Sequence, residues 1–243
     1  MLSPCAGVEM IPPLIVQSAL QQGLNLIAIT DHNASDNVPA VIKAAEGTDL
    51  AVLPGMELQT QEDVHVLCLF DRLEPLQELQ TLVDKYLPGI KNNAEYFGEQ
   101  FVVDHTGEFL QRKEQLLITA TQLSFEKAFQ TVTDLGGLFI PAHVNRQVFG
   151  LFYHLGFVPP DLPIEALEIS RHITIDQALN EFPQTNNYPL IQSGDVHFLD
   201  DFLGVNQFKI AEPTIPEIKM ALRGEKGRRF LIHSPFDDSL PKI

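Results

Sequence analysis

Side chains that bind transition metals recur along this chain, each near a stretch that is typical of a β-strand. They are Asp31 and His32, Glu57 within Gly55-Met56-Glu57, His65, His143 within Pro141-Ala142-His143, and Asp195 and His197 within Gly194-Asp195-Val196-His197. Imidazole nitrogens and carboxylate oxygens bind Zn, Mn and Fe at physiological pH, and a carboxylate can bridge two ions. The chain has only two Cys, which disfavours a thiolate site. The series therefore indicates a multinuclear metal site.

The elements that must position these side chains alternate between helix and strand patterns. Residues 11–22 have apolar side chains at helical spacing, and two Pro in the first turn are compatible with a helix. Residues 24–30 form a near-continuous apolar run, as in a parallel strand that is covered on both faces. Further helices are expected over 36–45, 75–84, 124–135, from 174 and over 214–224, and further strands over 50–54, 138–142, 164–170 and 189–193. The pattern predicts an α/β fold.

Two segments depart from this alternation. A turn over 59–63 would make its flanking strands antiparallel, so that Glu57 faces His65 on one side of the sheet. Residues 92–119 contain a hairpin pattern around Asp104-His105-Thr106-Gly107. We interpret this second segment as an insertion or lid.

Asp195 and His197 are two residues apart, a spacing that puts both side chains on one face of an extended segment. A single metal cluster can therefore use both. Barrel enzymes build their sites from the loops at the carboxyl ends of their strands. All of the metal-binding side chains are accordingly expected at one face of the fold.

Composition limits the classes of function. With 243 residues and 44% hydrophobic content, the chain is expected to form one domain over residues 1–243. The formal net charge of −16 disfavours an extended nucleic-acid surface, because such surfaces need clustered Lys and Arg, although one local positive site could bind a nucleotide. Cys5 and Cys68 lack disulfide-framework spacing, and no stretch resembles a membrane span or a signal peptide. We therefore expect a cytoplasmic protein without membrane contact.

The order of these motifs resembles that of the polymerase and histidinol phosphatase (PHP) family of metal-dependent phosphoesterases. The resemblance covers Leu2 to about Gly204 and is carried by Ile29-Thr30-Asp31-His32, Gly55-Met56-Glu57, His65-Val66-Leu67, Pro141-Ala142-His143 and Gly194-Asp195-Val196-His197. It implies a distorted TIM-like barrel of seven βα units with two or three divalent ions, Zn, Mn or Fe, that hydrolyses phosphate esters. By position, it implies the metal ligands His32, Glu57, His65, His143, Asp195 and His197.

The amino terminus departs from the family pattern. Family members usually begin with a strand that carries a His-X-His motif, whereas this chain starts at Met1-Leu2-Ser3-Pro4-Cys5, which resembles the loop after that strand. Two expected ligands would then be absent, fewer ions could bind, and a missing first strand would leave an unpaired barrel edge that favours a homo-oligomer. Cys5 falls where relatives often place a His or an Asp, so it is either a ligand for a soft metal or a small buried thiol.

The resemblance leaves two main functions open. In the first, a phosphoesterase uses two cations about 3.5 to 4 Å apart and a metal-activated hydroxide to hydrolyse a small phosphorylated substrate or a nucleotide. Arg146 and Arg171 could then seat the phosphate or form surface ion pairs, and His172 could donate a proton to the leaving group or lie at the surface. In the second, a truncated or degenerate domain binds a ligand or has a regulatory role without turnover. A proofreading role beside a polymerase is disfavoured, because no basic surface or polymerase segment is present.

Overall fold

The computed structural model describes residues 3–233 of the chain. Its helices are α1 (Pro12–Gln21), α2 (Val38–Ala45), α3 (Leu73–Tyr86), α4 (Ala94–Phe97), α5 (Phe125–Asp134), α6 (Leu151–His154), α7 (Ile175–Glu181) and α8 (Ile215–Arg223), with the 3-10 turns η1 (Pro183–Asn187) and η2 (Leu199–Asp201). Its strands are β1 (Leu26–Ile29), β2 (Ala51–Gln59), β3 (His65–Leu69), β4 (Phe101–Val103), β5 (Phe109–Arg112), β6 (Leu138–Pro141), β7 (Leu167–Ile169), β8 (Leu190–Gln192), β9 (Asn206–Lys209) and β10 (Arg229–Ile232).

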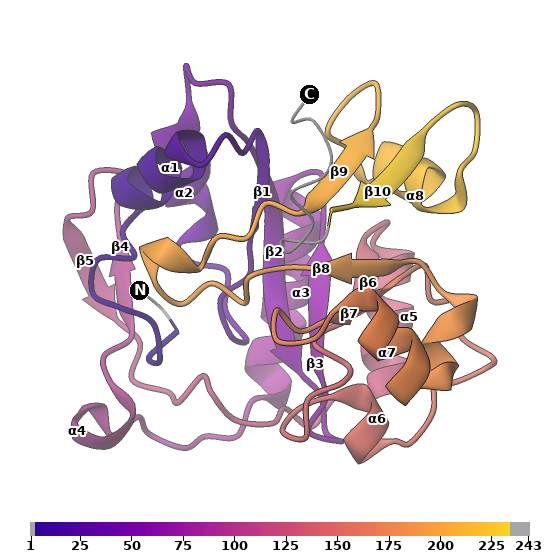
Figure 1. Ribbon diagram of the computed structural model, residues 1–243. Coiled ribbons are helices and arrows are strands. Elements are labelled where there is room, and N and C mark those ends of the chain that lie inside the picture. The colour runs from indigo at the N-terminus through magenta and orange to yellow at the C-terminus, as the bar shows by residue number, and fades with distance from the viewer. Residues whose placement is uncertain (1–2, 234–243) are drawn as a thin grey trace.

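A four-stranded sheet in the order β1-β2-β3-β6 forms the centre of the fold (Figure 1). β1 and β2 are parallel, whereas β3 is antiparallel to both β2 and β6. The carboxyl ends of β1, β2 and β6 therefore lie at the same edge of the sheet as the amino end of β3. β7 and β8 form a parallel pair that lies next to β6.

The α/β fold expected from the sequence is confirmed, and β2 and β3 are antiparallel, as the turn over 59–63 predicts. A closed TIM-like barrel is not confirmed, because the described strands form the central sheet and three two-stranded pairs. One of these pairs is the hairpin of β4 and β5, within residues 92–119. The single domain over 1–243 and the lid role of 92–119 stay predictions.

Local signals explain several helix boundaries. Ser124 caps α5 with its side chain, and Thr174 and Gln177 form the capping box at the start of α7. The same spacing occurs at α8, yet Thr214 makes no side-chain cap there. The carboxylate of Glu217 instead accepts hydrogen bonds from groups outside the helix.

The core lies on both faces of the central sheet. On one face, Met56 and Leu58 of β2 pack with side chains of α3 and α5, and on the other, Leu53 of β2 packs with side chains of α8. Side chains alternate along a strand, so Glu57 points to the same face as Leu53. A cavity of about 1110 Å³ lies against this second face, and Glu57 is among the residues that line it.

The free edges of two strands border the same cavity. Within residues 3–233, β1 pairs only with β2, and β8 pairs only with β7. Side chains of both strands line the cavity, including Ala28 and Ile191. None of the helices that the structure describes is both long and apolar enough to cross a bilayer.

Candidate metal centre

Four of the candidate ligands meet at the edge where β1, β2 and β6 end. His32 follows β1, Glu57 lies near the carboxyl end of β2, and His143 follows β6. His65 is the first residue of β3, which runs the other way, so its side chain reaches the same edge. In the register of β2 and β3, Glu57 lies opposite Leu67, not opposite His65. Glu57 and His65 are therefore diagonal neighbours on one face, which is within reach of long side chains.

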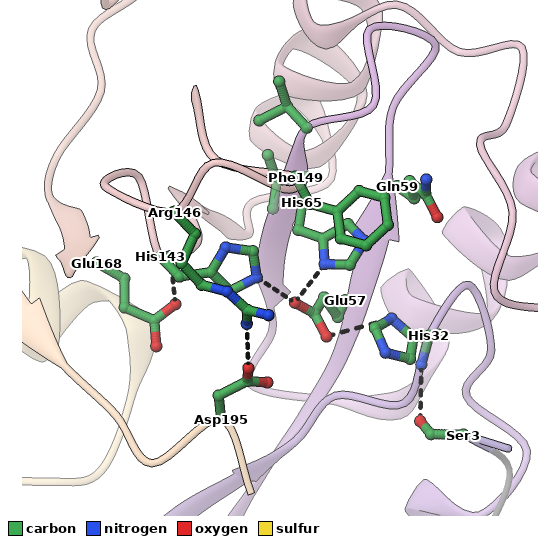
Figure 2. Close-up of polar contacts among 12 residues, drawn as sticks. Ser3, His32, Glu57, Gln59, His65, His143, Arg146, Phe149, Glu168 and Asp195 are labelled. Atoms are coloured by element: carbon green, nitrogen blue, oxygen red, sulfur yellow. Dashed lines mark hydrogen bonds and ion pairs between the residues drawn. The ribbon is translucent and has the colours of Figure 1, made fainter. Parts of the chain in front are cut away.

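The carboxylate of Glu57 lies between the three imidazoles (Figure 2). Its Oε1 atom is 3.0 Å from Nδ1 of His65 and 3.3 Å from Nε2 of His143, and its Oε2 atom is 3.3 Å from Nδ1 of His32. The four residues are between 2% and 7% exposed. We call His32, Glu57, His65 and His143 the Glu57 group.

One ring nitrogen of each histidine in this group lacks a hydrogen-bond partner among the described residues, whereas Nδ1 of His65 and Nε2 of His143 bond to Glu57. Nδ1 of His32, Nε2 of His65 and Nδ1 of His143 are buried without a partner in the part of the chain that is described. The 3.3 Å approach of His32 to Glu57 does not have hydrogen-bond geometry. Buried polar atoms are normally paired, and an unpaired one costs about 1 to 3 kcal/mol. Nδ1 of His32 both faces Glu57 and is unpaired within residues 3–233. A buried carboxylate approached by nitrogens of three imidazoles fits the ligand preferences of Zn, Mn or Fe.

A second set of possible ligands shares His32. One ligand atom from each of Cys5, His32 and His197 lies within 4.8 Å of the others. Cys5 is exposed, so it is not the small buried thiol that the sequence offered as an alternative. Partial desolvation opposes ionisation of its thiol, but the neighbouring imidazoles of His197 and His32 outweigh this and lower the pKa of Cys5 to about 6. The nearby Cys5 thiolate raises the pKa of His197 to about 10. We call these three residues the Cys5 group, and its thiolate would suit a softer ion.

Burial and charge act in opposite directions on the Glu57 group. Burial lowers the pKa of His32, but attraction to Glu57 and Cys5 raises it to about 9. For His65, burial prevails and lowers the pKa. Burial opposes ionisation of Glu57 too, yet the neighbouring imidazoles hold its pKa well below the usual range. Glu57 is therefore ionised at neutral pH.

Asp195 and His197 lie in the loop after β8, outside the Glu57 group. The carboxylate of Asp195 has its closest ion pair with Arg146, whose Nη1 atom lies 2.6 Å from Oδ2. Nδ1 of His197 lies 2.8 Å from the backbone oxygen of Asp195 and 3.6 Å from its Oδ1 atom. Asp195 has a positive φ of 48°, so the backbone turns there and is not extended as the two-residue spacing assumed.

Arg171 and His172 lie shortly after the end of β7. Arg171 contacts the loop that carries Asp195. The guanidinium of Arg171 donates to the Asp201 carboxylate at 2.9 Å and also to the backbone oxygens of Gly194 and Asp201. These contacts hold the loop together. His172 is exposed, and among the described residues no hydrogen bond or ion pair joins it to the candidate ligands.

Several residues that support the site carry no sequence signal of their own. Buried Asn33 donates to the backbone oxygens of Leu117 and Thr119 and accepts from Gln59, which fixes the turn after His32. The ring of Phe149 stacks on that of His65 with centroids 4.2 Å apart. Ser3 joins the two residues after β1: it donates to the carboxylate of Asp31, and its hydroxyl accepts from the backbone N–H of His32 (Figure 2).

Glu168 in β7 also supports the site, and the apolar strand pattern around it does not indicate this role. Its Oε2 atom accepts from the backbone N–H of His143 at 3.0 Å, and its Oε1 atom accepts from the Ser193 hydroxyl. Burial raises the pKa of this carboxyl, although His143 and Ser193 act against the rise. The one sequence feature that indicates such a role is a charged residue between Leu167 and Ile169 within a buried strand.

A model of the PHP domain matches residues 7–142, which is more than half of the chain. The chain belongs to the PHP domain family. It is 22% identical over 256 residues to the uncharacterized protein YqxK of Bacillus subtilis strain 168, and this alignment covers 94% of the chain and 59% of YqxK. The chain thus spans less than two thirds of that relative.

Solved structures share this PHP fold. The lesion-specific endonuclease PfuEndoQ from Pyrococcus furiosus is 20% identical with a TM-score of 0.71, covering 94% of this chain and 55% of that one. Endonuclease Q in complex with a 27-mer duplex substrate, which has an abasic lesion at the active site, gives a TM-score of 0.65 with the same identity and coverage. A two-domain protein from Bacteroides vulgatus with a predicted PHP-like metal-dependent phosphoesterase is 14% identical with a TM-score of 0.53, covering 96% and 62%.

The Endonuclease Q structures correct one expectation from the sequence. A small phosphorylated substrate or nucleotide, with no extended nucleic-acid surface, was expected from the net charge of −16. Proteins with this fold nevertheless include one bound to a duplex at its active site. Net charge sums over the whole surface, whereas a nucleotide at an active site meets only local groups, so the acidic composition does not exclude a nucleic-acid substrate.

Proposed function

We propose that this chain is a metal-dependent hydrolase that cleaves phosphodiester bonds in DNA. The observation that carries the proposal is the Glu57 group, in which ring nitrogens of His32, His65 and His143 lie 3.0 to 3.3 Å from the oxygens of one buried carboxylate. Together with the PHP family fold, this arrangement supports hydrolysis of a phosphate ester.

The two groups of ligands suggest how ions would be held. Glu57 is best placed to bridge, because its two oxygens face different imidazoles. Ligand atoms of His32, Glu57 and His65 lie within 4.8 Å of one another and would hold one ion, with His143 beside them, and the Cys5 group would hold a second. Divalent ions held there would lower the pKa of a water molecule and offset charge on the phosphoryl oxygens. The residues themselves fix the ligand directions and keep bulk water away.

DNA is favoured as the substrate by the likeness to Endonuclease Q, which extends over 94% of this chain. Arg146 is the candidate for contact with a phosphate, because its guanidinium lies at the site and is 40% exposed. Contact with DNA would depend on local groups such as Arg146, because the net charge of −16 sums over the whole surface.

A cleavage assay tests this function. The chain, loaded with Mn²⁺ or Zn²⁺, is incubated with an end-labelled duplex that contains one abasic site, with the undamaged duplex and with the single strand. We expect cleavage to give a shortened strand. EDTA and His143→Ala should each abolish this product, and Glu165→Gln, which removes a surface ion pair with Arg223, should leave it unchanged. Bound metal at full stoichiometry with no product from any of the three DNAs would reject the function.

A second function, ligand binding or regulation without turnover, is favoured by one contact. Arg146 lies 2.6 Å from Asp195 and neutralises the carboxylate that the family resemblance makes a metal ligand. If this pair persists in the metal-loaded protein, Asp195 takes no part in binding ions. The same assay separates the two functions, because a regulatory domain would bind DNA or metal and release no product.

A further inference from the structure

Glu168 is a buried carboxylate that the proposed reaction does not use. Glu168 is 3% exposed. Among the Asp and Glu residues of the described chain, 3–233, only Glu57 is buried as well. Burying a carboxylate is costly unless hydrogen bonds compensate it. Each oxygen of Glu168 accepts one hydrogen bond, and both donors belong to turns that carry candidate ligands.

The first donor lies in the turn after β6. The Oε2 atom of Glu168 accepts from the N–H of His143 at 3.0 Å, and its backbone oxygen accepts from the N–H of Val144 at 2.8 Å. One residue thus holds two successive N–H groups. His143 has a φ of +31°, a conformation that non-glycine residues adopt only when surrounding contacts impose it. The contacts from Glu168 are of that kind.

The second donor lies in the turn after β8. The Oε1 atom of Glu168 accepts from the hydroxyl of Ser193, which comes directly before Gly194 and Asp195. This turn is tightly constrained, because a Cβ at Gly194 would collide with the backbone oxygen of Asp201, and Asp195 has a φ of +48°. β7 lies between β6 and β8, pairing with β8 and packing beside β6, so Glu168 reaches both turns from one position.

We propose that Glu168 is a positioning residue of the metal centre, which clamps the turn of His143 to the turn of Asp195. The inference rests on the proposed metal-dependent function. Glu168 acts through the backbone of His143 and the hydroxyl of Ser193, and it does not itself bind the ion. In Figure 2 its carboxylate lies on the far side of His143 from Glu57, which suits a supporting role. Without Glu168, the His143 imidazole would have to become ordered when the ion binds, and this entropic cost would weaken metal binding.

The test measures metal affinity in the absence of substrate. Competition titrations with Mn²⁺ and Zn²⁺ and the visible spectrum of bound Co²⁺ are compared for the wild type, Glu168→Ala and Glu168→Gln. Removing a group that orients a metal ligand typically weakens metal binding about 10- to 100-fold, so we expect that loss and a changed Co²⁺ spectrum in Glu168→Ala. Gln keeps an oxygen that can accept from His143, so Glu168→Gln should recover most of the affinity.

Glu165→Gln is the matched control, because Glu165 lies three residues earlier and pairs with Arg223 at the surface. It should bind metal as the wild type does. Wild-type affinity and spectrum in a folded Glu168→Ala would overturn the clamp. If Glu168→Ala does not fold, Ser193→Ala carries the test, with several-fold weaker binding expected and unchanged binding overturning the inference.

These outcomes separate the clamp from the proposed function. A wild-type protein that binds metal tightly and cleaves no DNA would reject DNA hydrolysis and leave the clamp to be judged on affinity. Unchanged affinity in Glu168→Ala, with active wild type, would reject the clamp alone. A wild-type protein that binds no divalent ion would overturn both.

Discussion

Replacing Glu57 with Gln removes one negative charge from among three buried imidazoles and keeps the size of the side chain. In the metal-free protein, burial lowers the pKa of His32, but attraction to Glu57 and Cys5 raises it from 6.5 to about 9. A group whose pKa is raised on folding stabilises the fold fully below its unfolded pKa, and this stabilisation is lost as the pH rises through the folded value. The rise corresponds to about 3 kcal/mol.

We therefore expect Glu57→Gln to lower the free energy of unfolding by up to about 3 kcal/mol at pH 6 and by much less at pH 10, where His32 is neutral in both proteins. Denaturant unfolding in EDTA at the two pH values measures the difference. Glu165→Gln is the control, and loss of its surface ion pair should cost no more than about 1 kcal/mol at either pH. An equal loss at both pH values would refute the charge argument, and no loss at either would show that the Glu57 group does not assemble.

Three further predictions concern metal binding. Cys5→Ser should weaken binding of Zn²⁺ more than binding of Mn²⁺, because a thiolate prefers the softer ion; equal losses in competition titrations would count against Cys5 as a ligand. Apparent metal affinity should rise with pH between 6.5 and 9, because ions must displace protons from His32 and His197, whose pKa values are raised to about 9 and about 10; calorimetry that gives a flat profile would contradict this. Arg146→Gln should free the Asp195 carboxylate and tighten metal binding several-fold while raising KM for DNA, and unchanged values of both would remove Arg146 from the site.

The position of the Glu57 group could be predicted from the sequence because strand direction is a local property. An apolar run that ends in Asp31 and His32 places these residues at a carboxyl edge, and the turn over 59–63 reverses β3 so that His65 returns to it. The contacts with Glu57 also depend on the pairing of β1 with β2, of β2 with β3 and of β3 with β6. The structure brings the side chains of this group together around Glu57.

The remainder depends on contacts between distant parts of the chain. The pairing of β7 with β8 brings Glu168 to Ser193, and the packing of β7 beside β6 brings it to His143. Nothing in the residues around Glu168 reveals those partners. Likewise, Arg171 follows a strand as a phosphate ligand would, but Asp201, thirty residues later, engages its guanidinium. Whether strands close into a barrel also depends on such long-range pairing, so the alternation of elements could not decide it.

Anomalous diffraction from crystals grown with Mn²⁺ or Zn²⁺ would test most directly whether the Glu57 group holds metal. We expect a peak about 2.0 to 2.2 Å from a Glu57 oxygen and from nitrogens of His65 and His143. The absence of a peak there at saturating metal, with the three imidazoles turned away from Glu57, would contradict the metal centre and the function built on it.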